Sequence, residues 1–185
     1  MRILLCLILS TAMFNLCAAK LKTQEIRNEE NHSTCYWSPD IETEFDEPDS
    51  VKDYDLIAVM IDREVPDSAG NSSIFLMVAF YSEKGIGADP GDTLKLDING
   101  RTSYLSCAKE DHWHVSLRQI LDKPRRPGWI WMKLSYFEIS RELLSDMVKG
   151  KDVSLDVYLP DRHITGTILK SGRKVISKFC EKYVQ

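Results

Sequence analysis

The sequence lacks the motifs that mark most enzymes. It contains no Gly-x-Ser-x-Gly elbow, no His-Glu-x-x-His helix and no glycine-rich phosphate loop. Gly85 and Gly87 come closest to such a loop, but Pro90 follows them and would block a helix there. There is no internal repeat and no alternation of strands with helices. Nothing in the chain therefore predicts a nucleotide-binding fold or a catalytic site of a common class.

Long hydrophobic runs and an excess of positive charge are also missing. A membrane span needs about 20 consecutive apolar residues, and the apolar run that starts at Ile3 breaks at Ser10. The chain carries 24 Lys and Arg against 28 Asp and Glu, whereas nucleic acid favours a basic protein surface. We therefore expect neither a membrane span nor nucleic-acid binding. The acidic residues gather in 38–55 and the basic ones in 149–185, which we interpret as two solvated faces or as an acidic segment lying on a basic one.

Residues 1–19 have the three parts of a secretory signal peptide. Arg2 gives the positive charge, an apolar stretch follows, and Cys17-Ala18-Ala19 supplies the small residues that signal peptidase needs. We expect cleavage before Lys20 and export to the periplasm or the extracellular space. The alternatives are an uncleaved N-terminal anchor, a helix of the core and a lipoprotein acylated at Cys17. The bulky Leu16 disfavours the lipoprotein.

Residues 20–53 are polar and acidic without clear periodicity, which predicts an irregular N-terminal arm before a single β-rich domain over 54–185. Within that domain, residues 55–61 predict a strand, and 74–81 predict a central strand covered on both faces. Alternating residues over 128–137, 153–159 and 164–169 predict three more strands. Residues 108–122 are ambiguous, with Ser116 as a possible cap of a short helix.

The clearest local pattern is a hairpin around Asn99-Gly100, a pair that favours a type I′ turn. It places Leu94 opposite Leu105 and Leu96 opposite Ser103. In this register Cys107 lies on the same buried face as the leucines.

Two helices are predicted after the hairpin. Ser140 caps a helix that ends before Gly150. The spacing of Val175, Ile176 and Phe179 predicts an amphipathic C-terminal helix. The predicted fold class is α+β, mainly β: a small antiparallel β-sandwich or partly open barrel with a C-terminal amphipathic helix.

Cleavage of the signal leaves three cysteines, Cys35, Cys107 and Cys180, enough for one disulfide bond in an oxidising compartment. Cys107 points into the sheet, and Cys180 lies on the apolar stripe of the last helix, whereas nothing orients Cys35. We therefore expect a Cys107–Cys180 disulfide. The same buried position argues against Cys107 as a nucleophile.

His112 and His114 share one face of an extended strand, a spacing that lets two imidazoles reach one metal ion. No third ligand is evident, and the alternative is a polar connector with two solvated histidines. The favoured interpretation is that no metal and no cofactor is bound. A small metal-dependent hydrolase that uses His112 and His114 is the alternative function.

The segment 123–131 is the main candidate for recognition. It contains three cations, Lys123, Arg125 and Arg126, and two prolines that stiffen the loop. Trp129 and Trp131 follow on one strand face. If both indoles are exposed they form an aromatic platform beside a cationic rim. If they pack beneath a helix, the cations are merely solvated. The favoured function is an exported, non-catalytic binding protein, such as an inhibitor, an immunity-type partner or an envelope accessory factor, that binds another protein or an anionic ligand.

Overall fold

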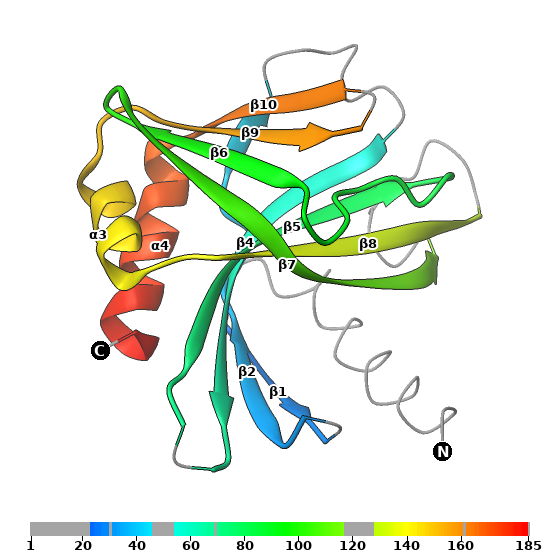
Figure 1. Ribbon diagram of the computed structural model, residues 1–185, viewed down its shortest axis with the longest axis horizontal. Helices are drawn as coiled ribbons and strands as arrows, with labels where there is room; N and C mark the ends of the chain where they lie inside the picture. The colour runs from blue at the N-terminus through cyan, green and yellow to red at the C-terminus, as the bar shows by residue number, and fades with distance from the viewer. Residues whose placement is uncertain are drawn as a thin grey trace.

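A computed structural model of the chain describes residues 23–29, 31–45, 54–68, 70–116, 128–160 and 162–184. The predicted signal peptide lies outside these residues. The described residues form ten strands and two helices (Figure 1). The strands are β1 Gln24–Asn28, β2 Ser33–Trp37, β3 Thr43–Phe45, β4 Tyr54–Pro66, β5 Ser73–Ser82, β6 Thr93–Ile98, β7 Arg101–Ser116, β8 Trp129–Glu138, β9 Val153–Leu159 and β10 Arg162–Ile168. The helices are α3 Arg141–Lys149 and α4 Lys170–Tyr183.

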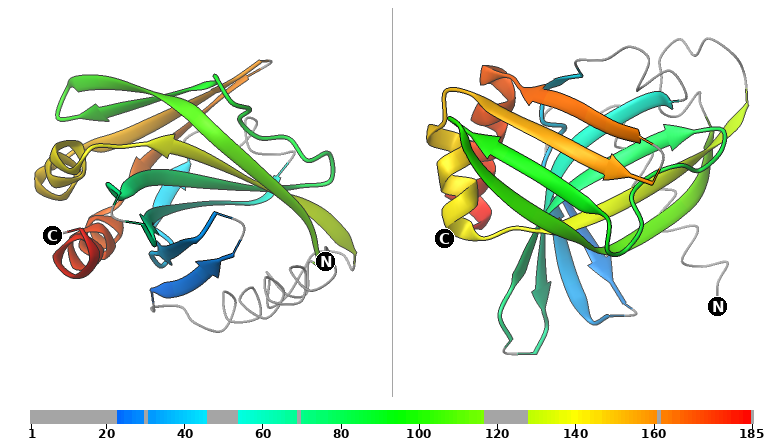
Figure 2. Two further views of the ribbon diagram at one scale, coloured as in Figure 1. Left: turned by 60° about the horizontal axis from the view of Figure 1, so that its bottom comes forward. Right: turned by 45° about the horizontal axis from the view of Figure 1, so that its top comes forward.

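All ten strands belong to one antiparallel sheet, in the order β1-β2-β4-β5-β8-β7-β6-β9-β10-β3. The sheet is open, because among the described strands β1 pairs only with β2 and β3 only with β10. Strand β7 joins its two halves: residues 101–106 pair with β6, and Cys107–Ser116 pair with β8 after a bulge at Cys107. The sheet bends over on itself there (Figure 2). This architecture confirms the predicted fold class.

The core lies where the two halves of the sheet and the helices meet. Leu76 and Phe80 of β5, Leu96 of β6, Leu155 of β9 and Phe179 of α4 all belong to it and are buried. A second apolar cluster lies on the opposite face of β4, β5 and β8, and Met77 is at 0 % exposure within it. Strand β5 is therefore buried on both faces, which confirms the prediction from its continuous apolar run.

The hairpin between β6 and β7 confirms the predicted register. Leu94 pairs with Leu105, and Leu96 pairs with Ser103. Asn99 and Gly100 both have positive φ, at 53° and 81°, as a type I′ turn requires. Cys107 is 3 % exposed and belongs to the core.

Helix α3 begins and ends as the sequence predicts, and the predicted amphipathic C-terminal helix is present as α4. The Ser140 hydroxyl accepts a hydrogen bond from the Leu143 amide, and the Gly150 amide donates to the Asp146 carbonyl. Helix α4 buries Ile176 and Phe179 and lies beside α3 (Figure 1). None of the helices in the described part of the chain is long and apolar enough to cross a membrane.

An irregular arm over residues 20–53 does not fit the structure, which has β1, β2 and β3 there. Strand β2 alternates buried and half-buried residues and pairs with β4, while β3 pairs with β10. Short polar segments acquire such structure from partners far along the chain, which local periodicity cannot reveal. The ambiguous stretch from residue 108 continues β7 to Ser116, and the possible helix after Ser116 lies outside the described residues.

Candidate functional site

Strands β7 and β8 form a hairpin arm at their far end. Beyond Cys107, strand β7 no longer pairs with β6 and pairs with β8 alone. Figure 1 shows both strands extending beyond the half of the sheet that contains β6, β9 and β10. The register places His114 opposite Trp131 and His112 opposite Lys133. Directly paired residues share a face, so both histidines lie on the Trp131 side of this arm.

Trp131 lies between the two imidazoles. Its ring centroid is 3.8 Å from that of His114, with 37° between the planes, and 5.8 Å from that of His112. Both histidines are exposed, and Trp131 is half-buried. Trp129, two residues earlier on the same strand face, is 66 % exposed. We call these four side chains, Trp129, Trp131, His112 and His114, the indole surface.

The two indoles differ in exposure because a loop approaches only one of them. Gly85 has a φ of +64°, and a Cβ added to it would lie 3.2 Å from Cγ of Trp131. The loop after β5 therefore covers part of Trp131, while Trp129 projects further along the arm. The sequence left open whether both indoles are exposed or both are packed. In the structure Trp129 is exposed and Trp131 is half-buried.

Lys133 lies next to the indole surface, two residues after Trp131 on β8 and directly opposite His112. Its side chain is 9 % exposed, and its ammonium pairs with Asp89 and, at 3.2 Å, with Glu110. Burial alone would lower the pKa of Lys133, but the hydrogen bonds that its ammonium donates to Asp89 and Glu110 outweigh burial, and the pKa is raised. Lys133 is therefore a charged residue whose charge is already neutralised. Arg125 and Arg126, the predicted cationic rim, lie outside the described residues.

The histidine pair has the predicted strand face but no metal-binding neighbourhood. Within the described residues, no group of three or more His, Cys, Asp or Glu side chains could hold a metal ion. One carboxylate lies close to the pair: Oε1 of Glu110 is 3.9 Å from Nδ1 of His112. Both imidazoles instead contact the Trp131 ring.

We expect zinc to be retained equally, at trace levels, by the wild type and by the His112→Ala/His114→Ala double variant. The reason is that a catalytic zinc needs three protein ligands. The measurement is metal analysis of the purified mature protein after dialysis against zinc. Stoichiometric zinc that disappears in the double variant would instead support the metal-dependent hydrolase.

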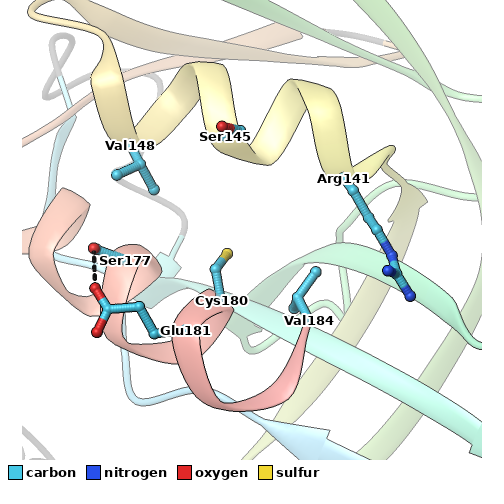
Figure 3. Close-up of a pocket in the computed structure, with 7 residues that line it drawn as sticks. All are labelled: Arg141, Ser145, Val148, Ser177, Cys180, Glu181 and Val184. Atoms are coloured by element: carbon cyan, nitrogen blue, oxygen red, sulfur yellow. Dashed lines mark hydrogen bonds between the residues drawn. The ribbon is translucent and has the colours of Figure 1, made fainter.

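The cysteines that the structure describes, Cys35, Cys107 and Cys180, are free thiols. The structure therefore lacks the expected Cys107–Cys180 disulfide. The Cys107 thiol lies 3.4 Å from the Lys109 carbonyl and 4.0 Å from the Ala88 carbonyl, inside the sheet. Cys180 is half-buried and faces the gap between the helices, opposite Ser145 (Figure 3). The two thiols thus face different surroundings.

We expect Cys180 to be the only one of these three thiols that a bulky disulfide reagent modifies rapidly in the native protein. Cys35 and Cys107 are buried, and burial raises the pKa of the Cys35 thiol to about 12. Burial, aided by the charge of Glu181, also raises the pKa of Cys180, so its reaction should speed up as the pH rises above neutral. Peptide mapping after timed labelling identifies the residue. A dominant Cys107–Cys180 disulfide peptide without reductant would contradict this expectation.

A shallow cavity of about 300 Å³ separates α3 from α4 (Figure 3). Arg141, Ser145 and Val148 line it from α3, and Ser177 and Cys180 line it from α4. The Ser177 hydroxyl donates to the Glu181 carboxylate at 2.9 Å. The raised pKa of Cys180 keeps this thiol protonated near neutral pH, so Cys180 is not an activated nucleophile.

A buried polar cluster on the second apolar face is the feature that sequence reasoning missed. Asp62 is 1 % exposed there, and burial raises its pKa to about 7. The Lys109 ammonium lies 2.6 Å from Oε2 of Glu64 and over the rings of Phe75 and Tyr136, at 4.7 and 4.8 Å. The available signal was the alternation of Ala58, Met60, Asp62 and Glu64, in which carboxylates continue the buried face of a strand.

Comparison with protein-family models, with curated proteins and with solved structures gives no match. The functional assignment therefore depends on the contacts described above.

Proposed function

We propose that this chain is an exported, non-catalytic binding protein that recognises another protein through the indole surface. The observation that carries the proposal is the exposure of Trp129, at 66 %, on an arm that projects beyond half of the sheet. Tryptophan is enriched among the residues that dominate protein interfaces, where it supplies a large apolar area with a polar N–H.

The neighbours of Trp129 suit an interface better than a catalytic site. The rings of Trp131 and His114 are in contact, tilted by 37°, and side chains that already pack against each other lose little freedom when a partner covers them. Lys133 is held by two carboxylates, so it does not serve as an unpaired base or electrophile. Arg125 and Arg126 come shortly before the arm in the sequence, and they are proposed to favour an acidic partner surface.

Export is the second part of the proposal, and residues 1–19 support it by their composition. Mass spectrometry of protein recovered from outside the cytoplasm should give a chain that begins at Lys20 and carries no lipid. Recovery of a chain that retains residues 1–19, or that is acylated at Cys17, would contradict the export route proposed here.

The binding test uses the mature wild-type protein as bait in the exported fraction of its host, followed by measurement of the affinity for the captured protein. Trp129→Ala is expected to weaken that affinity by about 30-fold, as for an interface anchor worth about 2 kcal/mol. Tyr104→Ala is the matched control, because Tyr104 is 68 % exposed on the other half of the sheet. Circular dichroism should show that both variants are folded. Equal affinity of the wild type and Trp129→Ala would overturn the proposal.

A further inference from the structure

Three polar side chains, each with one buried atom that lacks a hydrogen-bond partner, form one row at the edge of the sheet. Gln24 of β1 is directly opposite Trp37 of β2, and Trp37 is directly opposite Asp62 of β4. Paired residues on neighbouring strands share a face, so the three side chains are neighbours. The register continues from Asp62 to Phe75 of β5.

Each of the three side chains has a buried atom without a hydrogen-bond partner: Oε1 of Gln24, Nε1 of Trp37 and Oδ1 of Asp62. Asp62 is 1 % exposed and Trp37 is 7 % exposed. More than nine in ten buried polar groups in proteins are hydrogen-bonded, and leaving one unpaired costs about 1–3 kcal/mol. Two acceptors and one donor in a single row are therefore the pattern of a site that a polar ligand completes.

The charge around the row selects the ligand. Within the described residues, no ion pair involves Asp62, because the one cation beside it, Lys109, is bound to Glu64. The carboxylate of Asp111 adds further negative charge nearby. A buried carboxylate without a counter-ion favours a cation. A metal ion does not suit the site, since the described residues offer no cluster of metal ligands.

The buried polar cluster around Asp62 already binds one ammonium group, that of Lys109. The Lys109 ammonium lies against one carboxylate and over two aromatic rings, those of Phe75 and Tyr136. A protonated amine at the row would find a similar combination: the Asp62 carboxylate, the amide oxygen of Gln24 and the aromatic side chain of Trp37. The indole N–H of Trp37 needs an acceptor, so the ligand also carries a hydroxyl or a similar oxygen.

We propose that the Gln24–Trp37–Asp62 row binds a small protonated amine that carries a hydrogen-bond acceptor, with ethanolamine as the simplest example. Strand β1 is at the edge of the sheet, and Gln24 is only half-buried. The row therefore begins at the edge of the sheet, the side from which we expect a ligand to enter. This site lies on the opposite face of the sheet from the indole surface and does not depend on the function proposed above.

Isothermal titration calorimetry at pH 8 with ethanolamine as the probe tests the proposal. We expect saturable binding by the wild type, binding about tenfold weaker or absent in Asp62→Asn, and unchanged binding in Asp152→Asn, an exposed carboxylate control. Ethylene glycol, which lacks the charge, should not bind. Trp129→Ala should bind ethanolamine as the wild type does, which separates this site from the indole surface.

A second comparison tests the role of the indole N–H. Ethylamine lacks the acceptor and should bind the wild type about fivefold more weakly than ethanolamine, the worth of about one hydrogen bond. In Trp37→Phe, verified as folded by circular dichroism, the two amines should bind equally. Failure of the wild type to bind any amine at about 10 mM, or full binding by Asp62→Asn, would overturn the proposal.

The affinity should also fall as the pH drops below about 7, because the amine needs the Asp62 carboxylate. The groups that face Asp62 are Glu64, Asp111 and Lys109, with Cys35 and Tyr136 beside them. Burial raises the pKa of Asp62 itself to about 7, and burial also raises the pKa of the neighbouring Asp111, so the pH dependence is measured in Asp62→Asn as well, where it should disappear. Affinity that is constant between pH 6 and 8 would place the amine elsewhere.

Discussion

Asp62→Asn should stabilise the protein at pH 8 by a few kcal/mol and leave its stability at pH 4 nearly unchanged. Burial raises the pKa of Asp62 from 3.8 to about 7, so the folded state binds this proton more tightly than the unfolded state does. The contribution to stability is complete below pH 3.8 and is lost as the pH rises towards 7. A shift of this size corresponds to about 4 kcal/mol at most, and asparagine avoids the loss because it carries no charge.

The measurement is urea unfolding of the wild type and Asp62→Asn at pH 4, 6 and 8. Glu64 has a lowered pKa, through its hydrogen bonds to Lys109 and Ser33 against an opposing effect of burial. It therefore contributes stability that is lost only when the pH falls through its own, lower range, and this does not mask the Asp62 effect. Asp152→Asn is the control and should follow the wild type at every pH. A difference between the wild type and Asp62→Asn that is the same at pH 4 and pH 8 would contradict the role of burial.

Phe179→Ala should destabilise the protein by about 3–5 kcal/mol, the usual range for removing a buried phenylalanine from a core. Phe179 is 2 % exposed and attaches α4 to the core between the two halves of the sheet. Alanine is the better helix former, so any loss of stability reports the packing and not the helix itself.

The control for this substitution is Lys178→Ala, one residue earlier and exposed, which should change the free energy of unfolding by less than about 0.5 kcal/mol. Chemical denaturation at pH 6 measures both variants. Similar stability of Phe179→Ala and Lys178→Ala would mean that α4 is not part of the core.

The same buried charge of Asp62 explains both the expected loss of stability at high pH and the proposed binding of an amine. A charged group that destabilises the free protein and would be satisfied by a bound cation is typical of sites where stability is sacrificed to binding. The same substitution, Asp62→Asn, is expected to raise stability and to remove amine binding. Observation of both effects in one variant would be hard to explain by a purely structural role of the carboxylate.

The parts of the fold that could be predicted are those that local chemistry determines. Asn99-Gly100 fixes the turn, and the turn fixes the register that buries Leu96 and Cys107. Ser140 and Gly150 determine where α3 begins and ends. Each of these features depends on residues that are close in sequence, so a single chain is enough to recognise them.

The parts that could not be predicted depend on distant pairings. Strand β2 pairs with β4 about thirty residues later, and β3 pairs with β10 more than a hundred residues later. The row of Gln24, Trp37 and Asp62 exists only because three strands adopt one register. No local pattern in residues 20–53 contains that information, so the polar cluster could not be found from the sequence.

The sequence predicts two members of the candidate binding surface, Trp129 and Trp131, but neither the geometry of that surface nor the part that His112 and His114 take in it. The alternation over 129–137 places Trp129 and Trp131 on one face. It cannot show that Gly85 brings a loop against Trp131 and leaves Trp129 exposed. The contact between Trp131 and His114 likewise depends on the β7–β8 register. Sequence patterns assign side chains to faces, and tertiary contacts decide which of them remain exposed.

The most direct test of the proposed function is photo-crosslinking from the position of Trp129 in the host cell. A photoreactive phenylalanine analogue replaces Trp129 in one variant and Tyr104 in another, the two most exposed large aromatic residues of the described chain. The proposal predicts one discrete protein adduct from position 129 that excess unlabelled wild-type protein suppresses, and no such adduct from position 104. The same adducts from both positions, or none from position 129, would contradict recognition of a protein by the indole surface.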